Sequence, residues 1–514
     1  MNAAPPRATT RSWFGLGVLV LPLLLIGIDA TVLILALPQI SADLRPSGAE
    51  QLWMIDIYSL MLAGLLVTMT SIGERFGRRR VLLIGAVFFT IASVMGALST
   101  TPLVLILSRA VLGIAGATIM PSTLSLIRNM FLDREQRRFA MAVWGAMASV
   151  GAAAGPIVGG WIIEHFSWQA AFLMNIPIML LLLVLGPFVL PESKNPDLRR
   201  IDLLSVGVSL VSMLALVYGI KSVAGGKDVP LGIAALLLAA VGFWIFVRRQ
   251  LALPTPLIDV RLFRRRHFRG AVVGDLLSIF ALVGALVALT QYMQLVLGLG
   301  PLESALWLLP QAAIAAVAAF IAAALVKRIA PVVVVSIGLG VATTGFLVLL
   351  SLTPHSHPAV VAAALCLISL GAGVGMTLTN DIIMSSVPPE RAGQAAATSE
   401  TAYELGTTLG TAVLGSVLVA WYANAVAGAR ELANVPADLL SRAESTIAEA
   451  TLVAREIGGA TGELLLSTAQ AAFTEGIVIT GAVGAGIMGL AVAWAAWTLR
   501  GASATKDLSV EHDH

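Results

Sequence analysis

The sequence predicts an all-α integral membrane protein with fourteen transmembrane helices. Hydrophobic residues make up 58% of the 514 residues and charged residues only 12%, whereas soluble proteins have about 25% charged residues. A helix needs roughly 20 apolar residues to cross about 30 Å of hydrocarbon, and fourteen continuous apolar runs meet this need. Because these runs do not alternate with polar residues, a membrane β-barrel is excluded. The spans are expected near 14–37, 52–72, 81–99, 102–126, 139–163, 168–190, 203–221, 230–248, 269–296, 302–326, 332–352, 358–386, 394–421 and 473–499.

The same composition excludes several classes of protein. A chain this apolar is neither a soluble enzyme nor a disordered protein, and a net charge of +3 gives little basis for binding nucleic acid. Cys366 is the single cysteine, so an intrachain disulfide or a Cys-based metal site is not expected. The first apolar run is too long for a cleavable signal peptide and lacks its exit sequence. We expect no metal and no organic cofactor.

The distribution of lysine and arginine predicts the orientation in the membrane. If the N-terminus is cytoplasmic, 25 of the 32 basic residues fall in cytoplasmic segments, six fall outside and Arg109 lies within a span. Cytoplasmic loops carry an excess of basic residues in membrane proteins. Both termini are therefore expected in the cytoplasm, and the number of spans is even.

The chain also shows an internal repeat. Gly151 and Gly155 in the fifth span recur 255 residues later as Gly406 and Gly410 in the thirteenth. Chance matches in a chain with 48 glycines are the alternative explanation. Two parallel six-helix halves place a substrate site between them, near the bilayer midplane. We expect a first half at 1–195, two inserted helices at 196–250, a second half at 251–500 and a cytoplasmic tail at 501–514.

Two segments of the sequence are rich in glycine. After the second span, the loop Gly73–Arg80 combines turn-forming glycines with arginines that hold it in the cytoplasm. In the fifth span, small residues allow close helix packing and a proline bends the helix; close packing alone is the simpler alternative. The candidate residues in these two segments are Glu74, Arg75, Gly77, Arg78, Gly151, Gly155, Pro156, Gly159 and Gly160.

The loop and the fifth-span segment stand beside further distinctive blocks of the sequence. The blocks are Asp29–Val32, Gln51–Leu60, Arg109, Met120–Arg128, Gly151–Gly160 and Phe172–Pro177. Together they resemble the major facilitator superfamily, specifically its fourteen-span drug:proton antiporters. The resemblance implies a major facilitator fold with two inserted helices, a bacterial plasma membrane, and export driven by a proton gradient without a cofactor. It also implies that the fifth-span block is the family's antiporter motif and that this block and the loop act in gating. The chain departs from the family at Thr70 and Glu74, where glycine and aspartate are usual.

Acidic residues within the spans are the main functional candidates. An ionised side chain near the centre of a membrane helix costs about 2.5–3.5 kcal/mol. One basic residue in the spans, Arg109, cannot neutralise six acids, and the excess suits a site for cations and protons. The six acids are Asp29, Asp56, Asp275, Asp381, Glu400 and Glu404.

Asp29 and Arg109 lie at similar depth. At about 1.5 Å per residue, they are roughly 13 and 10 Å below the outer surface, so they can pair if spans one and four are neighbours, as the resemblance implies. We predict that Asp29 carries the coupling proton and that Arg109 controls its proton affinity. A static structural ion pair is the alternative.

Other acids are predicted to bind substrate. Asp56 lies near Trp53 and Tyr58, and an acid beside aromatic rings suits a lipophilic cation; an aspartate at the membrane interface is the alternative. Glu400 and Glu404 share one helix face because they are four residues apart. Glu404 is close to the midplane, so we predict that it binds a substrate cation or a second proton.

The remaining two acids, Asp275 and Asp381, lie only about 10 Å from the cytoplasmic side. They are either gate or entry residues or simply exposed to water. On the opposite side, residues 422–472 form a long loop, in which Asp438–Ile457 and Glu463–Phe473 show helical spacing around Gly458-Gly459. We expect an extracellular helical hairpin there, either as a linker or as a cap on the exit path.

Together these features predict a proton-coupled multidrug efflux antiporter of the bacterial inner membrane that works by alternating access. The expected substrates are lipophilic cations such as quaternary ammonium compounds, cationic dyes and biguanides, and the expected partners are these drugs, protons and the lipid bilayer. We expect a monomer. The alternative is an exporter of one antibiotic or metabolite with the same fold. Neither a catalytic nucleophile–base pair nor a phosphate-binding loop is evident, so an enzyme is not expected.

Overall fold

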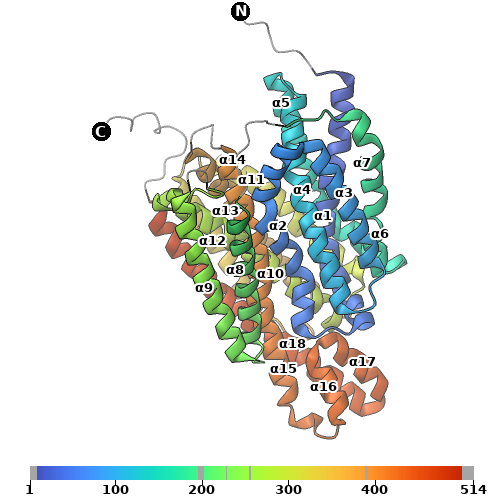
Figure 1. Ribbon diagram of the computed structural model, residues 1–514. Coiled ribbons are helices and arrows are strands. Elements are labelled where there is room, and N and C mark those ends of the chain that lie inside the picture. The colour runs from blue at the N-terminus through green and yellow to red at the C-terminus, as the bar shows by residue number, and fades with distance from the viewer. Residues whose placement is uncertain (1–7, 195–201, 227, 254–255, 388–391, 501–514) are drawn as a thin grey trace, which may run out of the picture. The chain divides into compact units, whose positions relative to one another are not determined.

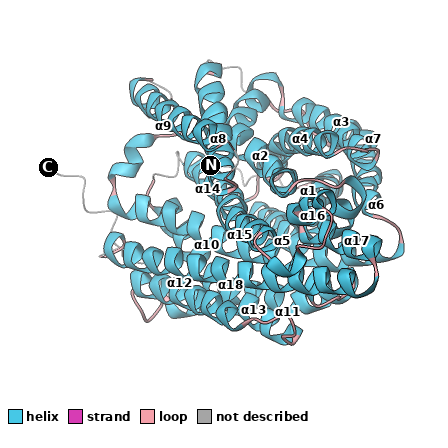
Figure 2. Ribbon diagram, turned by 90° about the horizontal axis from the view of Figure 1, so that it is seen from below, coloured by secondary structure: helices cyan, strands magenta, loops and turns pink. Residues whose placement is uncertain are grey.

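The computed structural model describes residues 8–194, 202–226, 228–253, 256–387 and 392–500. Within these ranges the chain is helical and contains no strand (Figure 2). Fourteen of its helices are long and apolar enough to cross a membrane, which confirms the predicted number of spans. The helices are α1 (Thr10–Leu44), α2 (Gly48–Phe76), α3 (Arg78–Ala97), α4 (Pro102–Met130), α5 (Arg134–His165), α6 (Trp168–Leu173), α7 (Asn175–Val189), α8 (Leu203–Ala224), α9 (Val229–Ala252), α10 (Arg266–Gln291), α11 (Pro301–Leu325), α12 (Pro331–Val348), α13 (Pro358–Ser385), α14 (Ala392–Gly410), α15 (Ser416–Ala427), α16 (Ala437–Ser445), α17 (Ile447–Ile457) and α18 (Gly459–Thr498).

The chain forms two compact units. The three-part division predicted from the sequence stays a prediction, and its boundary at 195–196 lies outside the described residues, as does the tail at 501–514. The first unit comprises Met1–Pro46, Trp53–Met213 and Gly300–Leu306, and the second comprises Ser47–Leu52, Leu214–Leu299 and Trp307–His514.

In the first unit, α1 packs along α5, and α3 packs between α4 and α7 (Figure 2). Some helices of this unit begin where a side-chain oxygen accepts a hydrogen bond from a free backbone N–H group. Thr101 caps α4 and Asp133 caps α5 in this way. The predicted sixth span is divided, because α6 ends at Leu173 and α7 begins at Asn175. This break places Asn175 in the interior of the unit.

In the second unit, α12 packs between α13 and α18, and α10 contacts α13 and α14 (Figure 2). Two spans contain π-helical turns, which are often found at functional sites. The turn η2 (Tyr292–Val296) extends α10, and η5 (Thr411–Gly415) joins α14 to α15. Short 3₁₀ turns are η1 (Val260–Arg264), η3 (Leu349–Ser351) and η6 (Arg430–Leu432).

The segment predicted as a helical hairpin differs from the prediction in two details. Asp438–Ile457 forms two helices, α16 and α17, because Thr446 adopts an extended conformation and its side chain caps α17. Glu463–Phe473 is not a separate helix but the beginning of the long α18. Gly458 divides α17 from α18 with a φ of 64°. Figure 1 shows α16 and α17 gathered beside the ends of α15 and α18.

Ion pairs and a hydrogen bond hold α16 and α17 in place. Arg442 on α16 bonds to Glu449 at 2.9 Å and to Glu456 at 2.9 Å. The hydrogen bond to Glu449 is the main reason why the pKa of Arg442 is raised above its ordinary value. The hydroxyl of Tyr422 on α15 donates to the Ala443 carbonyl at 2.9 Å. The segment is thus ordered against α15 rather than being a loose connection.

Candidate functional site

The glycines of α5 bring this helix into direct contact with the backbone of α1. A Cβ at Gly151 would lie 2.3 Å from the Leu24 carbonyl oxygen, and one at Gly155 would lie 1.8 Å from the Thr31 hydroxyl. Side chains essentially never approach so closely, so only glycine fits at this contact. Leu24 and Thr31 flank Asp29 on α1. The predicted antiporter motif therefore packs on the part of α1 that carries this acid.

Gly159 continues this contact, whereas Gly160 faces another helix. A Cβ at Gly159 would lie 2.7 Å from the Val32 side chain of α1, and one at Gly160 would lie 3.0 Å from Ala305 of α11. Pro156 is buried inside α5. The close packing expected from the sequence is present, while a role of these residues in gating stays a prediction.

A second close contact positions Arg109. A Cβ at Gly113 on α4 would lie 2.3 Å from the Tyr58 carbonyl oxygen on α2. One helical turn earlier on α4, the Arg109 guanidinium carbon lies 4.5 Å from the centre of the Tyr58 ring. Its Nε donates to the Met54 carbonyl at 3.3 Å. These contacts fix the guanidinium in an interior where only 2% of Arg109 is exposed.

Asp29 receives this guanidinium. Nη1 of Arg109 donates to Oδ2 of Asp29 at 2.6 Å, a short distance typical of a charge-assisted hydrogen bond. Nδ2 of Asn175 donates to Oδ1 of Asp29 at 3.3 Å and also lies 3.1 Å from the Ser93 hydroxyl. We call Asp29, Arg109, Tyr58, Asn175 and Ser93 the Asp29 cluster. The pairing expected from depth is present in the structure.

Asn175 and Ser93 were not among the predicted site residues. The signal for Asn175 was present in the sequence, since this asparagine stands two residues before Pro177 in an otherwise apolar run. A proline cannot donate a backbone hydrogen bond, so the chain breaks there and the amide side chain turns inward. Ser93 lies in an ordinary apolar helix, α3, and its small hydroxyl gave no comparable signal.

Three residues predicted to bind a substrate cation lie on α2, and one of them, Tyr58, belongs to the Asp29 cluster. Asp56 is fully buried on α2, which favours a position within the protein over the alternative at the lipid headgroups. Tyr58 is also buried, and its ring faces Arg109. Trp53 is half-buried. The structure therefore places Tyr58 with the ion pair, and binding of a substrate by these three residues stays a prediction.

The second unit repeats the glycine contact. A Cβ at Gly406 on α14 would lie 2.4 Å from the Leu276 carbonyl oxygen, and one at Gly410 would lie 2.4 Å from the Phe280 carbonyl oxygen. Both carbonyls belong to α10. Asp275 directly precedes Leu276, so a buried acid again stands where a glycine face meets its partner helix.

Asp275 is bound by hydroxyl groups. It is 3% exposed, and its Oδ2 accepts from the Ser399 hydroxyl at 2.8 Å. Its Oδ1 lies 3.4 Å from the Thr379 hydroxyl, which also donates to the Gly375 carbonyl at 2.9 Å. Within the described part of the chain, no lysine or arginine forms an ion pair with this carboxylate. We call Asp275, Ser399 and Thr379 the Asp275 cluster; the sequence predicted only its acid.

The other predicted acids of this unit lie in different environments. Glu400 and Glu404 stand on α14, as expected; Glu404 is buried and Glu400 is half-buried. Glu400 directly follows Ser399, so α14 carries both glutamates and part of the Asp275 cluster. Asp381 is exposed near the end of α13, and its role as a gate or entry residue stays a prediction.

The loop after α2 forms a compact turn. Gly77 has a φ of 108°, a left-handed conformation that favours glycine. Arg78 pairs with Glu74 at 3.3 Å, so the glutamate keeps a contact within its own loop. The side chain of Arg75 is exposed. Glu192, which the sequence did not single out, accepts from the Arg79 backbone N–H at 3.1 Å and holds the turn against the end of α7.

Comparison with known proteins agrees with this architecture. The sequence pattern of the Major Facilitator Superfamily matches residues 19–411. The multidrug efflux pump LfrA of Mycolicibacterium smegmatis is 43% identical over 483 residues, which cover 93% of this chain and 94% of LfrA. The methyl viologen resistance protein SmvA of Salmonella typhimurium is 34% identical over 465 residues, covering 90% of this chain and 93% of SmvA.

Solved structures show the same fold. A bacterial homolog of the human lysosomal transporter Spinster, in an inward-facing and unoccupied conformation, superposes with a TM-score of 0.66 at 17% identity, covering 96% of this chain and 98% of that one. The protein is a multi-pass membrane transporter and not an enzyme. The chain belongs to the major facilitator superfamily, within its branch of multidrug efflux pumps.

Proposed function

We propose that this protein is a proton-coupled antiporter that exports lipophilic cations, including quaternary ammonium compounds, cationic dyes and biguanides. The observation that carries the proposal is the buried pair of Asp29 and Arg109, packed against the glycine contact between α1 and α5. Buried ionisable groups in membrane helices mark proton and ion pathways. The energy source is the proton gradient, and no cofactor takes part.

The Asp29 cluster gives this coupling a physical basis. Protonation of Asp29 neutralises the carboxylate that pairs with Arg109. The guanidinium then lacks a compensating charge in a buried site. The guanidinium must therefore find new partners, which alters the contacts among α1, α2 and α4. Because the glycine contact leaves no free space between α1 and α5, a shift of α1 is transmitted to α5. Binding of a proton thus changes helix packing.

Drug binding is assigned to acids near aromatic or polar groups. Asp56 beside Trp53 and Tyr58, and Glu400 with Glu404 on α14, supply negative charge for a cation. When protons enter from outside, protonation weakens cation binding and the drug is released. The relative SmvA is named for resistance to methyl viologen, a quaternary bipyridinium dication, which supports cationic substrates.

The proposal includes a monomer in the bacterial plasma membrane with both termini in the cytoplasm. The excess of basic residues in alternate loops supports this orientation.

The second candidate is a narrow exporter of one antibiotic. Relatives named for resistance to tetracenomycin C and puromycin favour it, with 30% and 31% identity. Competition among dicationic, monocationic and neutral compounds for export distinguishes the two.

Transport in inverted membrane vesicles tests the proposed function. We expect ethidium to accumulate when a pH gradient is imposed and to leak out when the gradient is collapsed. The Asp29→Asn variant should lose this gradient-driven transport while remaining inserted and eluting as a folded protein in detergent. Transport that is indifferent to the pH gradient, or full activity of the variant, would contradict proton coupling.

A further inference from the structure

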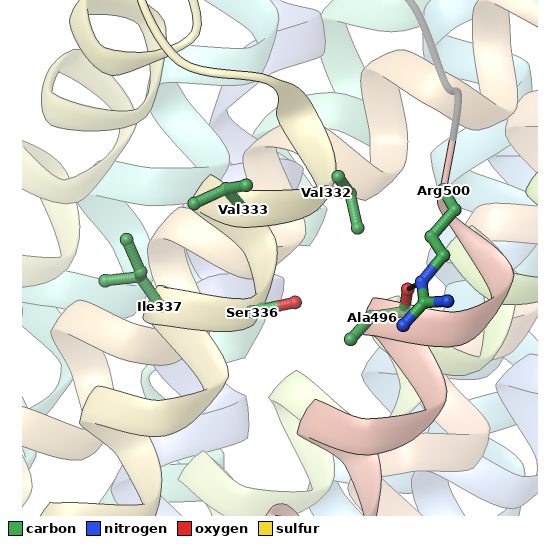
Figure 3. Close-up of a pocket in the computed structure, with 6 residues that line it drawn as sticks. All are labelled: Val332, Val333, Ser336, Ile337, Ala496 and Arg500. Atoms are coloured by element: carbon green, nitrogen blue, oxygen red, sulfur yellow. Dashed lines mark hydrogen bonds between the residues drawn. The ribbon is translucent and has the colours of Figure 1, made fainter.

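A cleft of about 410 Å³ lies between α12 and α18, near the beginning of α12 and the end of α18. Figure 3 shows Val332 and Ser336 of α12 facing Ala496 of α18 and Arg500, which follows α18, across this space, with Val333 and Ile337 on the outer side of α12. The walls are almost entirely aliphatic. The guanidinium of Arg500 is the charged group of the lining.

The walls of this cleft have the character of a surface in contact with lipid. Val333 is 44% exposed and Ile337 is 51% exposed on a helix that is apolar enough to span the membrane. Trp497 is 58% exposed, and its ring lies 5.6 Å from that of Trp494. Tryptophan is enriched at the level of the lipid headgroups. The cleft therefore lies at the boundary between acyl chains and headgroups.

Basic groups gather at the polar end of the cleft. Nε of Arg500 donates to the Ala496 carbonyl at 3.0 Å, which holds the guanidinium over the cleft (Figure 3). The backbone carbonyl of Arg500 accepts from Arg266 and, at 3.0 Å, from His267 Nε2. Lys327 and Arg328 lie four and three residues before the start of α12 at Pro331 and are exposed. The segments 260–270, 326–333 and 494–500 contain no acidic residue.

We propose that this cleft binds an anionic phospholipid. One acyl chain lies between α12 and α18 against Val332 and Ala496, and the phosphate is held by Arg500 with Arg266 nearby. Basic groups at the cytoplasmic ends of membrane helices bind anionic headgroups in this way. Assignment to the cytoplasmic leaflet rests on the proposed orientation; the binding itself does not. The positive charge also argues against a lipophilic cation as occupant, because Arg500 repels it.

Native mass spectrometry of the purified protein tests this site. The protein is titrated with phosphatidylglycerol or phosphatidylcholine that carry the same acyl chains. We expect phosphatidylglycerol to bind at least about 5-fold more tightly, and Arg500→Gln to lower this affinity about 5-fold, the effect of one basic group near a lipid surface. Val332→Trp, which fills the cleft, should weaken binding of both lipids.

Arg128→Gln is the matched control, because Arg128 is an exposed arginine at the end of α4 in the other unit. Equal affinity for the two lipids, an equal effect of the control, or no effect of Val332→Trp would overturn the proposal. Displacement of the lipid by a dicationic drug would show that the cleft binds substrate instead. If lipid binds only to a chain that ends at Arg500, residues 501–514 and not lipid would occupy the cleft in the full chain, and the proposal would be wrong. These results do not depend on transport, so they are distinct from the test of proton coupling.

Discussion

The two buried carboxylates of the Asp29 and Asp275 clusters stand in similar packing but in different electrostatic surroundings. Each lies on a helix whose backbone touches the glycines of a partner helix. Asp29 faces the guanidinium of Arg109 at 2.6 Å, whereas Asp275 accepts from the hydroxyls of Ser399 and Thr379. The two units thus share the same kind of helix packing, but a guanidinium faces the buried carboxylate in the first unit and hydroxyl groups face it in the second.

The two acids also differ in their place along the repeat. In the first unit Gly151 touches Leu24, and Asp29 lies five residues further along α1. In the second unit Gly406 touches Leu276, and Asp275 lies one residue earlier on α10. At 1.5 Å per residue the two positions differ by about 9 Å along the helix. The acids are therefore not two copies of one site.

The largest effect is expected when the compensating charge of the Asp29 cluster is removed. Arg109→Gln leaves Asp29 buried without its cationic partner, which costs about 3–5 kcal/mol for a buried ion pair. Thermal unfolding of the purified protein in detergent measures this loss. In the double variant Asp29→Asn/Arg109→Gln, both charges are gone and much of the stability should return. If the double variant is as unstable as Arg109→Gln alone, the pair is not held by charge.

A smaller loss of stability, similar in the two units, is expected at the glycine contacts. Gly151→Ala and Gly406→Ala each place a methyl group against a backbone carbonyl at 2.3–2.4 Å, and overpacking of this kind costs about 1–3 kcal/mol. The two variants should lose similar stability, although their units differ in charge. Gly145→Ala serves as the control, because its Cβ would meet no atom within 4 Å. A large loss in only one of the two variants would show that the packing is not repeated.

The sequence predicted the number and positions of the spans because long apolar runs and basic loops have few physical solutions in a membrane. The pairing of Asp29 with Arg109 was predicted from their similar depth together with the resemblance to the family, which implies that spans one and four are neighbours. It did not predict Ser399, Thr379 or Asn175. Hydroxyl and amide side chains are common in membrane helices, and only the packing of helices shows which of them meet an acid.

The same limit applies in the segments that connect the spans. Thr446, which divides α16 from α17, lies in a stretch whose apolar spacing is compatible with one continuous helix. Glu192, which holds the turn at Gly77, belongs to a short polar connection with no periodicity to interpret. Local signals predict where a helix is favourable, but a cap or a turn contact is decided by the neighbouring element.

The smallest effect is expected within the Asp275 cluster, where neutral hydroxyls share the interaction. Ser399→Ala removes the 2.8 Å bond to Oδ2 and should cost roughly 0.5–1.5 kcal/mol, the net contribution of one hydrogen bond, because Thr379 still bonds to the carboxylate. Thr379→Val should cost less, since its 3.4 Å contact is long and its hydroxyl also bonds to Gly375. Thermal unfolding of both variants beside Asp275→Asn measures the order. If Thr379→Val were as damaging as Ser399→Ala, the two hydroxyls would hold the carboxylate equally. A loss for Ser399→Ala as large as that for Arg109→Gln would remove the distinction between charge and hydroxyl compensation on which the comparison of the two units depends.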